Sequence, residues 1–268
     1  MSGRQRNWEA LSFQIAMTAI AVLALILIVS PSLVVVIVSF TSGFSLKFPP
    51  PGYSTRWFRE LVTADSWRLS IVNSLLIGAG TTTLATLLGT LAALGLRGRR
   101  ASLVFSTLRT VFLLPMVVPA VVLGVGMQLM FSRYGLTNTY LGVIIAHTVV
   151  AVPFVLVNVS SALQGVDVRL EQAAASLGAA PATVLFAVTL PIALPGIISG
   201  ALFAFATSLD EVVLTLFVAG PNQRTLARQM FATIRENISP AIVSAAAVFI
   251  VGTIVLSLAM LAVRRRLA

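Results

Sequence analysis

Two adjacent acidic residues, Asp210 and Glu211, interrupt the apolar stretch GALFAFATSLDEVVLTLFVAG at 200–220. An ionisable side chain within a membrane helix is costly and usually faces a cavity or a partner. Because consecutive helical residues point about 100° apart, at most one of the two carboxylates points squarely into a pore. We expect Asp210 to attract a cation along a transport pathway. For Glu211, a pathway role and a structural ion pair with an arginine are equally good interpretations.

Few other residues could support chemistry. His147 lies in an apolar span, and a single histidine cannot provide two haem ligands, so we expect a packed or hydrogen-bonded side chain. Asn73 and Ser74 either face a pathway or bond to a neighbouring helix. The absence of cysteine excludes disulfides, thiol catalysis and cysteine-based metal sites. We therefore expect no catalytic residue, no metal site and no cofactor bound by this chain.

The composition is that of an integral membrane protein. The 268 residues are 58% hydrophobic and 10% charged, and the mean hydropathy is +1.00. Soluble domains have about 25% charged residues. The net charge of +10 could suggest a nucleic-acid partner, but arginine clusters beside apolar spans are better explained by membrane topology and anionic lipid head groups. We expect no nucleic-acid partner.

Charge-free runs predict an all-α polytopic protein that forms one transmembrane domain over residues 1–268. Each run exceeds the roughly 20 residues that a helix needs to cross the hydrocarbon core. A β-barrel is excluded, because its strands are about ten residues long and alternate apolar with polar residues. Six membrane helices are expected near 13–40, 70–96, 104–131, 140–162, 193–218 and 241–263.

A short helix outside the bilayer is predicted near 168–178, between the fourth and fifth spans. Asp167 is a good N-cap, and Gly178 can end the helix in the left-handed conformation. Pro181 disfavours continuation. The middle of this helix is thin, because Ala173 and Ala174 are small, so it can enter a groove that a bulkier helix cannot. The alternative is a tight loop on the protein's own surface.

The spacing in this segment resembles the cytoplasmic signature of binding-protein-dependent ABC importer permeases. That signature is Glu-Ala-Ala, three residues, Gly, nine residues, then Ile-x-Leu-Pro. Here Ala173 and Ala174 precede Gly178 by the same interval, and Val188-Thr189-Leu190-Pro191 follows nine residues later. Two positions depart from the pattern: Gln172 replaces the glutamate, with Glu171 just before it, and Val188 replaces isoleucine. Which of Glu171 and Gln172 makes the polar contact is therefore open.

The resemblance implies that this short helix docks into a cleft of a cytoplasmic ATPase. Its expected ATPase-coupling residues are Asp167, Glu171, Gln172, Ala173, Ala174 and Gly178. No Walker A pattern occurs in the chain, so ATP and Mg²⁺ are expected on two separate ATPase subunits. The family also implies a second, paralogous permease and a periplasmic substrate-binding protein. Because ATP is cytoplasmic, the resemblance implies a protein of the bacterial inner membrane with both termini on the cytoplasmic side.

The fifth span also resembles the permeases of spermidine/putrescine importers. Those have a Ser-x-Asp-Asp/Glu block followed by a Gly-Pro turn, as in SLDE at 208–211 and AGP at 219–221. The resemblance implies a polyamine substrate, and acidic groups suit a polycation. Related permeases carry 4-aminobutyrate, opines or other amines, and these remain alternatives.

Two other classes of membrane protein fit less well. An ion-coupled secondary transporter needs titratable groups near the midplane and usually internal repeats. Only Asp210 and Glu211 qualify, and no repeat is apparent. A membrane anchor for an electron-transfer enzyme is poorly supported by one histidine and no cysteine.

Overall fold

The computed structural model describes residues 2–98, 103–236 and 238–267, without the side chains of 2–10, 12, 236, 259, 260 and 263–267. Over these residues the ordered structure is helical, apart from one isolated antiparallel bridge between Thr41 and Tyr53. The expected all-α class is therefore confirmed. The chain forms two compact units, one of residues 1–61 with 237–251 and the other of residues 62–236 with 252–268.

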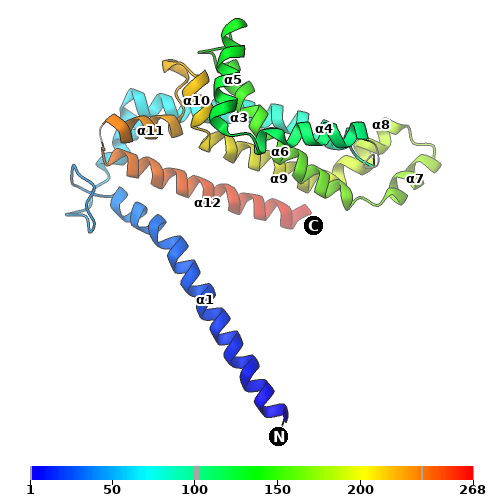
Figure 1. Cartoon of the computed structure of the whole chain (residues 1–268), viewed down its shortest axis with the longest axis horizontal. Coiled ribbons are helices and arrows are strands. Elements are labelled where there is room, and N and C mark those ends of the chain that lie inside the picture. The colour runs from blue at the N-terminus through cyan, green and yellow to red at the C-terminus, as the bar shows by residue number, and fades with distance from the viewer. Residues whose placement is uncertain (1, 99–102, 237, 268) are drawn as a thin grey trace. The chain divides into compact units, whose positions relative to one another are not determined.

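Figure 1 shows the helices in chain order. They are α1 (Ser2–Ser39), α2 (Arg56–Thr63), α3 (Asp65–Gly95), α4 (Leu103–Leu113), η1 (Leu114–Met116), α5 (Ala120–Arg133), α6 (Tyr140–Gln164), α7 (Val168–Ser176), α8 (Pro181–Val184), η2 (Leu185–Thr189), α9 (Leu190–Asp210), α10 (Val213–Val218), η3 (Pro221–Gln223), α11 (Leu226–Glu236) and α12 (Ala241–Leu267). Within the described residues, five helices are long and apolar enough to cross a membrane, and the bent pair α4–α5 makes six if it counts as one span.

The third expected span, 104–131, differs from a single helix. Its two halves, Leu103–Met116 and Ala120–Arg133, meet at an angle of 100°. The break coincides with Pro115 and Pro119, whose rings remove backbone N–H donors and clash with the preceding turn.

The fifth expected span, 193–218, also differs. Its helix begins earlier, at Pro181, and passes through a π-helical turn, Leu185–Thr189, before α9. It then breaks at Glu211, which has the extended conformation, and resumes as α10 at Val213. The break contains neither glycine nor proline.

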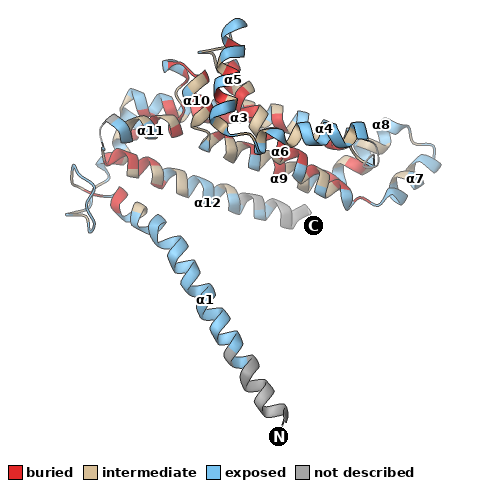
Figure 2. Cartoon of the chain, viewed as in Figure 1, coloured by how far each residue is buried: buried red, intermediate tan, exposed pale blue. Residues whose placement is uncertain are grey.

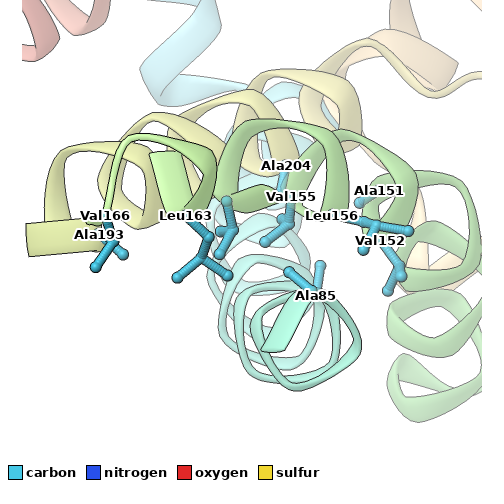
Figure 3. Packing of buried hydrophobic residues seen from close by; sticks show 11 residues of the cluster. Ala85, Ala151, Val152, Val155, Leu156, Leu163, Val166, Ala193 and Ala204 are labelled. Carbon is cyan, nitrogen blue, oxygen red and sulfur yellow. The ribbon is translucent and has the colours of Figure 1, made fainter. Parts of the chain in front are cut away.

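In the larger unit α3, α6 and α9 pack against one another. Their buried residues form a continuous cluster that includes Ala85, Val155 and Ala204, drawn in Figure 3. Two glycines allow the close approach at Val155. A Cβ on Gly89 would lie 2.6 Å from the Val155 Cβ, and one on Gly200 would lie 3.0 Å from its Cα. In Figure 2 the buried residues follow these three helices, whereas α7 is mostly exposed.

A second buried cluster joins α3, α5, α6 and α10, with Phe131, Val143 and Leu214 fully buried or nearly so. The smaller unit is held by polar contacts at its loops. The Ser244 hydroxyl of α12 donates to the Ser39 carbonyl at the end of α1, 2.8 Å away. The Trp57 indole N–H donates to the Gly43 carbonyl at 3.2 Å.

Candidate functional site

The short helix α7 begins and ends at the caps expected from the sequence. The Asp167 carboxylate accepts a hydrogen bond from the Arg169 backbone N–H at 2.9 Å. Gly178 follows the helix with φ +86°, in the left-handed region that glycine favours. Apart from Gly178 itself and its two chain neighbours, no atom lies within 4 Å of the position that a Cβ on Gly178 would occupy, so this end of α7 is open.

The Glu171 carboxylate joins three segments of the chain. Its Oε1 accepts hydrogen bonds from Arg97 Nη1 at 2.5 Å and from the Thr189 hydroxyl at 2.6 Å. Arg97 lies just beyond α3, and Thr189 is the last residue of η2. The second Arg97 amino group, Nη2, donates to the Val166 carbonyl at 3.2 Å. We refer to Arg97, Glu171 and Thr189 as the carboxylate bridge.

The bridge holds Glu171 in its ionised form. Partial burial by itself would raise the pKa of Glu171. Hydrogen bonds from Thr189 and Arg97, together with the positive charge of Arg97, outweigh that effect and hold the pKa below its ordinary value of 4.5. The side chains of Arg97 and Glu171 are each only 22% exposed, so water screens this pair less than a surface ion pair.

The rest of α7 is largely exposed. None of its residues is buried. Gln172 and Ala173 are exposed and Ala174 is half-buried. The Gln172 side chain makes no hydrogen bond within the described part of the chain, and Leu177, at the C-cap, is 89% exposed. Of the two polar candidates, Glu171 is committed to contacts inside the chain and Gln172 is available outside it.

At the far end of α9 the two acids of the fifth span have different environments. We call Asp210, Glu211 and Val212 the acidic break. Glu211 Oε1 accepts a hydrogen bond from the Leu214 backbone N–H at 2.9 Å, so it caps the start of α10. Asp210 is exposed and makes no hydrogen bond or ion pair with any residue that the structure describes. It also lies at the C-terminal, partially negative end of α9.

His147 spans the acidic break from α6. Its Nδ1 lies 2.9 Å from the Ser208 hydroxyl, before the break, and its Nε2 lies 2.9 Å from the Thr215 hydroxyl, after it. Because the Thr215 hydroxyl donates to the Glu211 carbonyl at 2.9 Å, it must accept from His147 Nε2–H. Ser208 then donates to Nδ1. The expected hydrogen-bonded histidine is present, and it fixes the two helical pieces relative to each other.

Asn73 and Ser74 bond to neighbouring segments. Asn73 Nδ2 donates to the Asn222 and Arg224 carbonyls at 2.9 and 3.0 Å. The Ser74 hydroxyl accepts from the Leu226 N–H at 2.7 Å. Among the described residues, no three His, Asp or Glu side chains come together in a way that could hold a metal ion.

The roles of three site residues cannot be predicted from the sequence. Arg97 belongs to the cluster RGRR at 97–100, a pattern that indicates membrane topology and lipid contact. Thr189 occupies the variable position of the Val-Thr-Leu-Pro motif, so the motif assigns it no role. The bridging role of His147 has no local signal, because Ser208 and Thr215 lie 61 and 68 residues away from it.

Residues 85–268 match the family model described as binding-protein-dependent transport system inner membrane component. The putrescine transport system permease protein PotI of Escherichia coli (strain K12) is 38% identical over 234 residues, which cover 84% of this chain and 82% of PotI. The spermidine/putrescine transport system permease protein PotC of the same strain is 30% identical over 233 residues, which cover 85% of this chain and 86% of PotC. Both α7 and the acidic break lie within the matched family region.

Among solved structures, a similar fold occurs in a bacterial ABC transporter involved in the import of the acidic polysaccharide alginate. The TM-score is 0.74 at 16% identity, and the alignment covers 97% of this chain and 99% of the other. At that identity the likeness concerns the fold alone.

Proposed function

This chain belongs to the family of binding-protein-dependent transport system inner membrane components, and we propose that the importer it serves as a permease subunit carries a polyamine such as putrescine or spermidine. The chain is a multi-pass membrane protein, and ATP hydrolysis belongs to a separate subunit. The names of PotI and PotC support the substrate class. The observation that carries the proposal is the Asp210 carboxylate, which has no partner among the described residues of its own chain.

In the assembly that we propose, this subunit pairs with a second, paralogous permease. Two cytoplasmic ATPase subunits bind ATP and Mg²⁺, and a periplasmic binding protein delivers the substrate. The chain itself holds no cofactor. It lies in the bacterial inner membrane with both termini cytoplasmic, which puts α7 on the side where ATP is available and the acidic break toward the outer side.

The proposed contact with the ATPase is the exposed face of α7. Ala173 keeps this face narrow, Gly178 leaves its end open, and Leu177 offers an apolar side chain for a cleft. Gln172 is the polar group on this face, because Glu171 is bonded within the chain. Ala174 is half-buried, on the side of the helix away from this face. Asp167 caps the start of the helix.

A polyamine suits the acidic break physically. In a medium less polar than water, the attraction between a carboxylate and an ammonium group is several times stronger than in bulk solvent. Phe203 lies seven residues before Asp210 and therefore on the same face of α9. It is 45% exposed and its ring stacks with Phe154, with ring centroids 6.5 Å apart. An aromatic surface two helical turns from a carboxylate, on the same face, suits an extended alkylammonium ion.

The test is uptake of labelled putrescine, spermidine and 4-aminobutyrate into proteoliposomes that contain the complete importer, with and without ATP and binding protein. We expect ATP-dependent uptake of a polyamine. Asp210→Asn should lower uptake at subsaturating polyamine roughly tenfold, as expected for loss of a hydrogen bond to a charged group. The matched control is Asp65→Asn, which removes an exposed carboxylate paired with Arg68. ATP-dependent uptake of 4-aminobutyrate alone would exclude the polyamine.

A further inference from the structure

We infer that Glu171 is a positioning residue that transmits movement from α7 to the membrane helices, and that Arg97 and Thr189 receive it. The carboxylate bridge thus works inside the permease, behind the face that meets the ATPase. This inference rests on the proposed function, because it requires an ATPase that moves α7.

The first support is the weak attachment of α7 to its own chain. Its residues include none that is buried, so apolar packing holds it only loosely. Within the described residues, the side-chain hydrogen bonds that join α7 to other helices all involve Glu171. Besides its contacts with α8 and η2 and the backbone at its two ends, α7 is therefore linked to the membrane helices through the Glu171 carboxylate.

The second support is the link to α3, which the backbone does not provide. Arg97 and Glu171 are 74 residues apart in the sequence. Arg97 also donates to the Val166 carbonyl in the connection that leads from α6 into α7. One guanidinium thus holds both α7 and the segment before it, and it does so from the end of α3, which packs along α6 and α9.

The third support is the link to α9. Thr189 is buried and ends a π-helical turn, a feature that is often found at functional sites. Its hydroxyl donates to Glu171, and α9 begins at the next residue. The 21 residues of α9 form a rod about 30 Å long that ends at Asp210. A displacement of Glu171 therefore reaches the acidic break through one continuous helix.

The experiment measures substrate imported per ATP hydrolysed, using the complete importer in proteoliposomes. Arg97→Gln should lower this ratio roughly tenfold, because it removes the charged partner of Glu171. The matched control is Arg109→Gln, which lies on α4, outside α7, is exposed and has no side-chain partner among the described residues. It should change the ratio by no more than about twofold, as expected of an exposed charge.

Two further variants separate a transmitting role from a merely structural one. Thr189→Val keeps the branched shape but removes the hydroxyl that donates to Glu171, and it should lower the ratio while ATPase binding persists. The charge swap Arg97→Glu with Glu171→Arg should recover at least part of the ratio that each single change loses. An unchanged ratio in both Arg97→Gln and Thr189→Val would overturn the inference.

Failure of the inference is distinguishable from failure of the proposed function. If the unaltered importer takes up a polyamine with ATP but the bridge variants remain fully coupled, only the inference is wrong. The unaltered importer could instead show no ATP-dependent polyamine uptake while the bridge variants still alter the uptake of another amine per ATP. In that case the proposed polyamine substrate is wrong, and the inference about the carboxylate bridge stands.

Discussion

The carboxylate bridge and the acidic break each contain an acidic side chain in a predominantly apolar protein, yet the two carboxylates differ in their exposure and in their hydrogen-bond partners. Glu171 accepts hydrogen bonds from Arg97 and Thr189 and is largely shielded from solvent. Asp210 is exposed and has no partner within the described residues. The same helix, α9, begins beside the first site and ends at the second.

This difference separates two uses of a carboxylate. A paired and partly buried carboxylate fixes segments in place, and removing one partner leaves the other uncompensated. A carboxylate without a partner in or near a membrane stabilises nothing in its own chain, so its cost is offset only by something that arrives from outside. We therefore associate Glu171 with mechanical coupling and Asp210 with the cationic substrate.

The largest expected effect comes from the histidine that holds the acidic break. His147→Leu leaves the buried hydroxyls of Ser208 and Thr215 without their ring partner, which should cost roughly 2–6 kcal/mol of stability. The measurement is thermal unfolding of the purified importer in detergent. His147→Gln can still donate toward Thr215 and should lose less. Equal stability of His147→Leu and the unaltered protein would mean that the break does not depend on His147.

A smaller effect is expected at the end of α7. Gly178→Asp puts a charged side chain at the open end of the helix and forces an L-residue to φ +86°, a strain of roughly 1–3 kcal/mol. Uptake should fall roughly tenfold or more while the membrane helices stay folded. Gly135→Asp is the control, because Gly135 also has a positive φ, +66°, with no atom within 4 Å. If both variants lose uptake equally, α7 has no special role.

The carboxylate bridge should also respond to acid. Because the pKa of Glu171 is depressed in the folded chain, its contribution to stability is complete above its ordinary pKa of 4.5. The contribution is lost as the pH falls through the lower, folded-state value. Protease cleavage of the α7 segment should therefore increase below pH 4.5, and Glu171→Gln should abolish that dependence. If Glu171→Gln shows the same increase in cleavage at low pH, the increase comes from another titratable group.

The smallest effect is expected at Gln172. Gln172→Ala would remove the neutral hydrogen bond to the ATPase that we propose for this side chain, worth about 1 kcal/mol, and should weaken ATPase binding roughly fivefold. Co-purification at graded ATPase concentrations measures this. Gln164→Ala, at the exposed end of α6, is the control. Unchanged ATPase binding in Gln172→Ala would mean that another residue of α7 makes the polar contact with the ATPase.

Sequence reasoning recovers the membrane helices because charge in hydrocarbon is costly, so that charge-free runs mark the spans. It also recovers α7, because the Asp167 cap and the left-handed Gly178 are local signals. The family assignment is confirmed by the match over residues 85–268.

The remaining features depend on contacts between distant residues. The bend at Pro115 and Pro119 has a visible cause, yet composition alone treats 104–131 as one apolar run. The acidic break contains no proline or glycine and instead coincides with bonds from His147 and the Glu211 cap. Arg97 meets Glu171 only because α3 and α6 end side by side in the fold.

The most direct test applies the same chemical change to both acids. Asp210→Asn and Glu171→Gln each replace a carboxylate with an amide of nearly the same shape, and polyamine uptake and ATP hydrolysis are measured together in the complete importer. Asp210→Asn should raise the polyamine concentration needed for half-maximal uptake and leave uptake per ATP unchanged. Glu171→Gln should lower uptake per ATP and leave that concentration unchanged. If the two variants change the same quantity, the division between a coupling acid and a substrate acid is wrong.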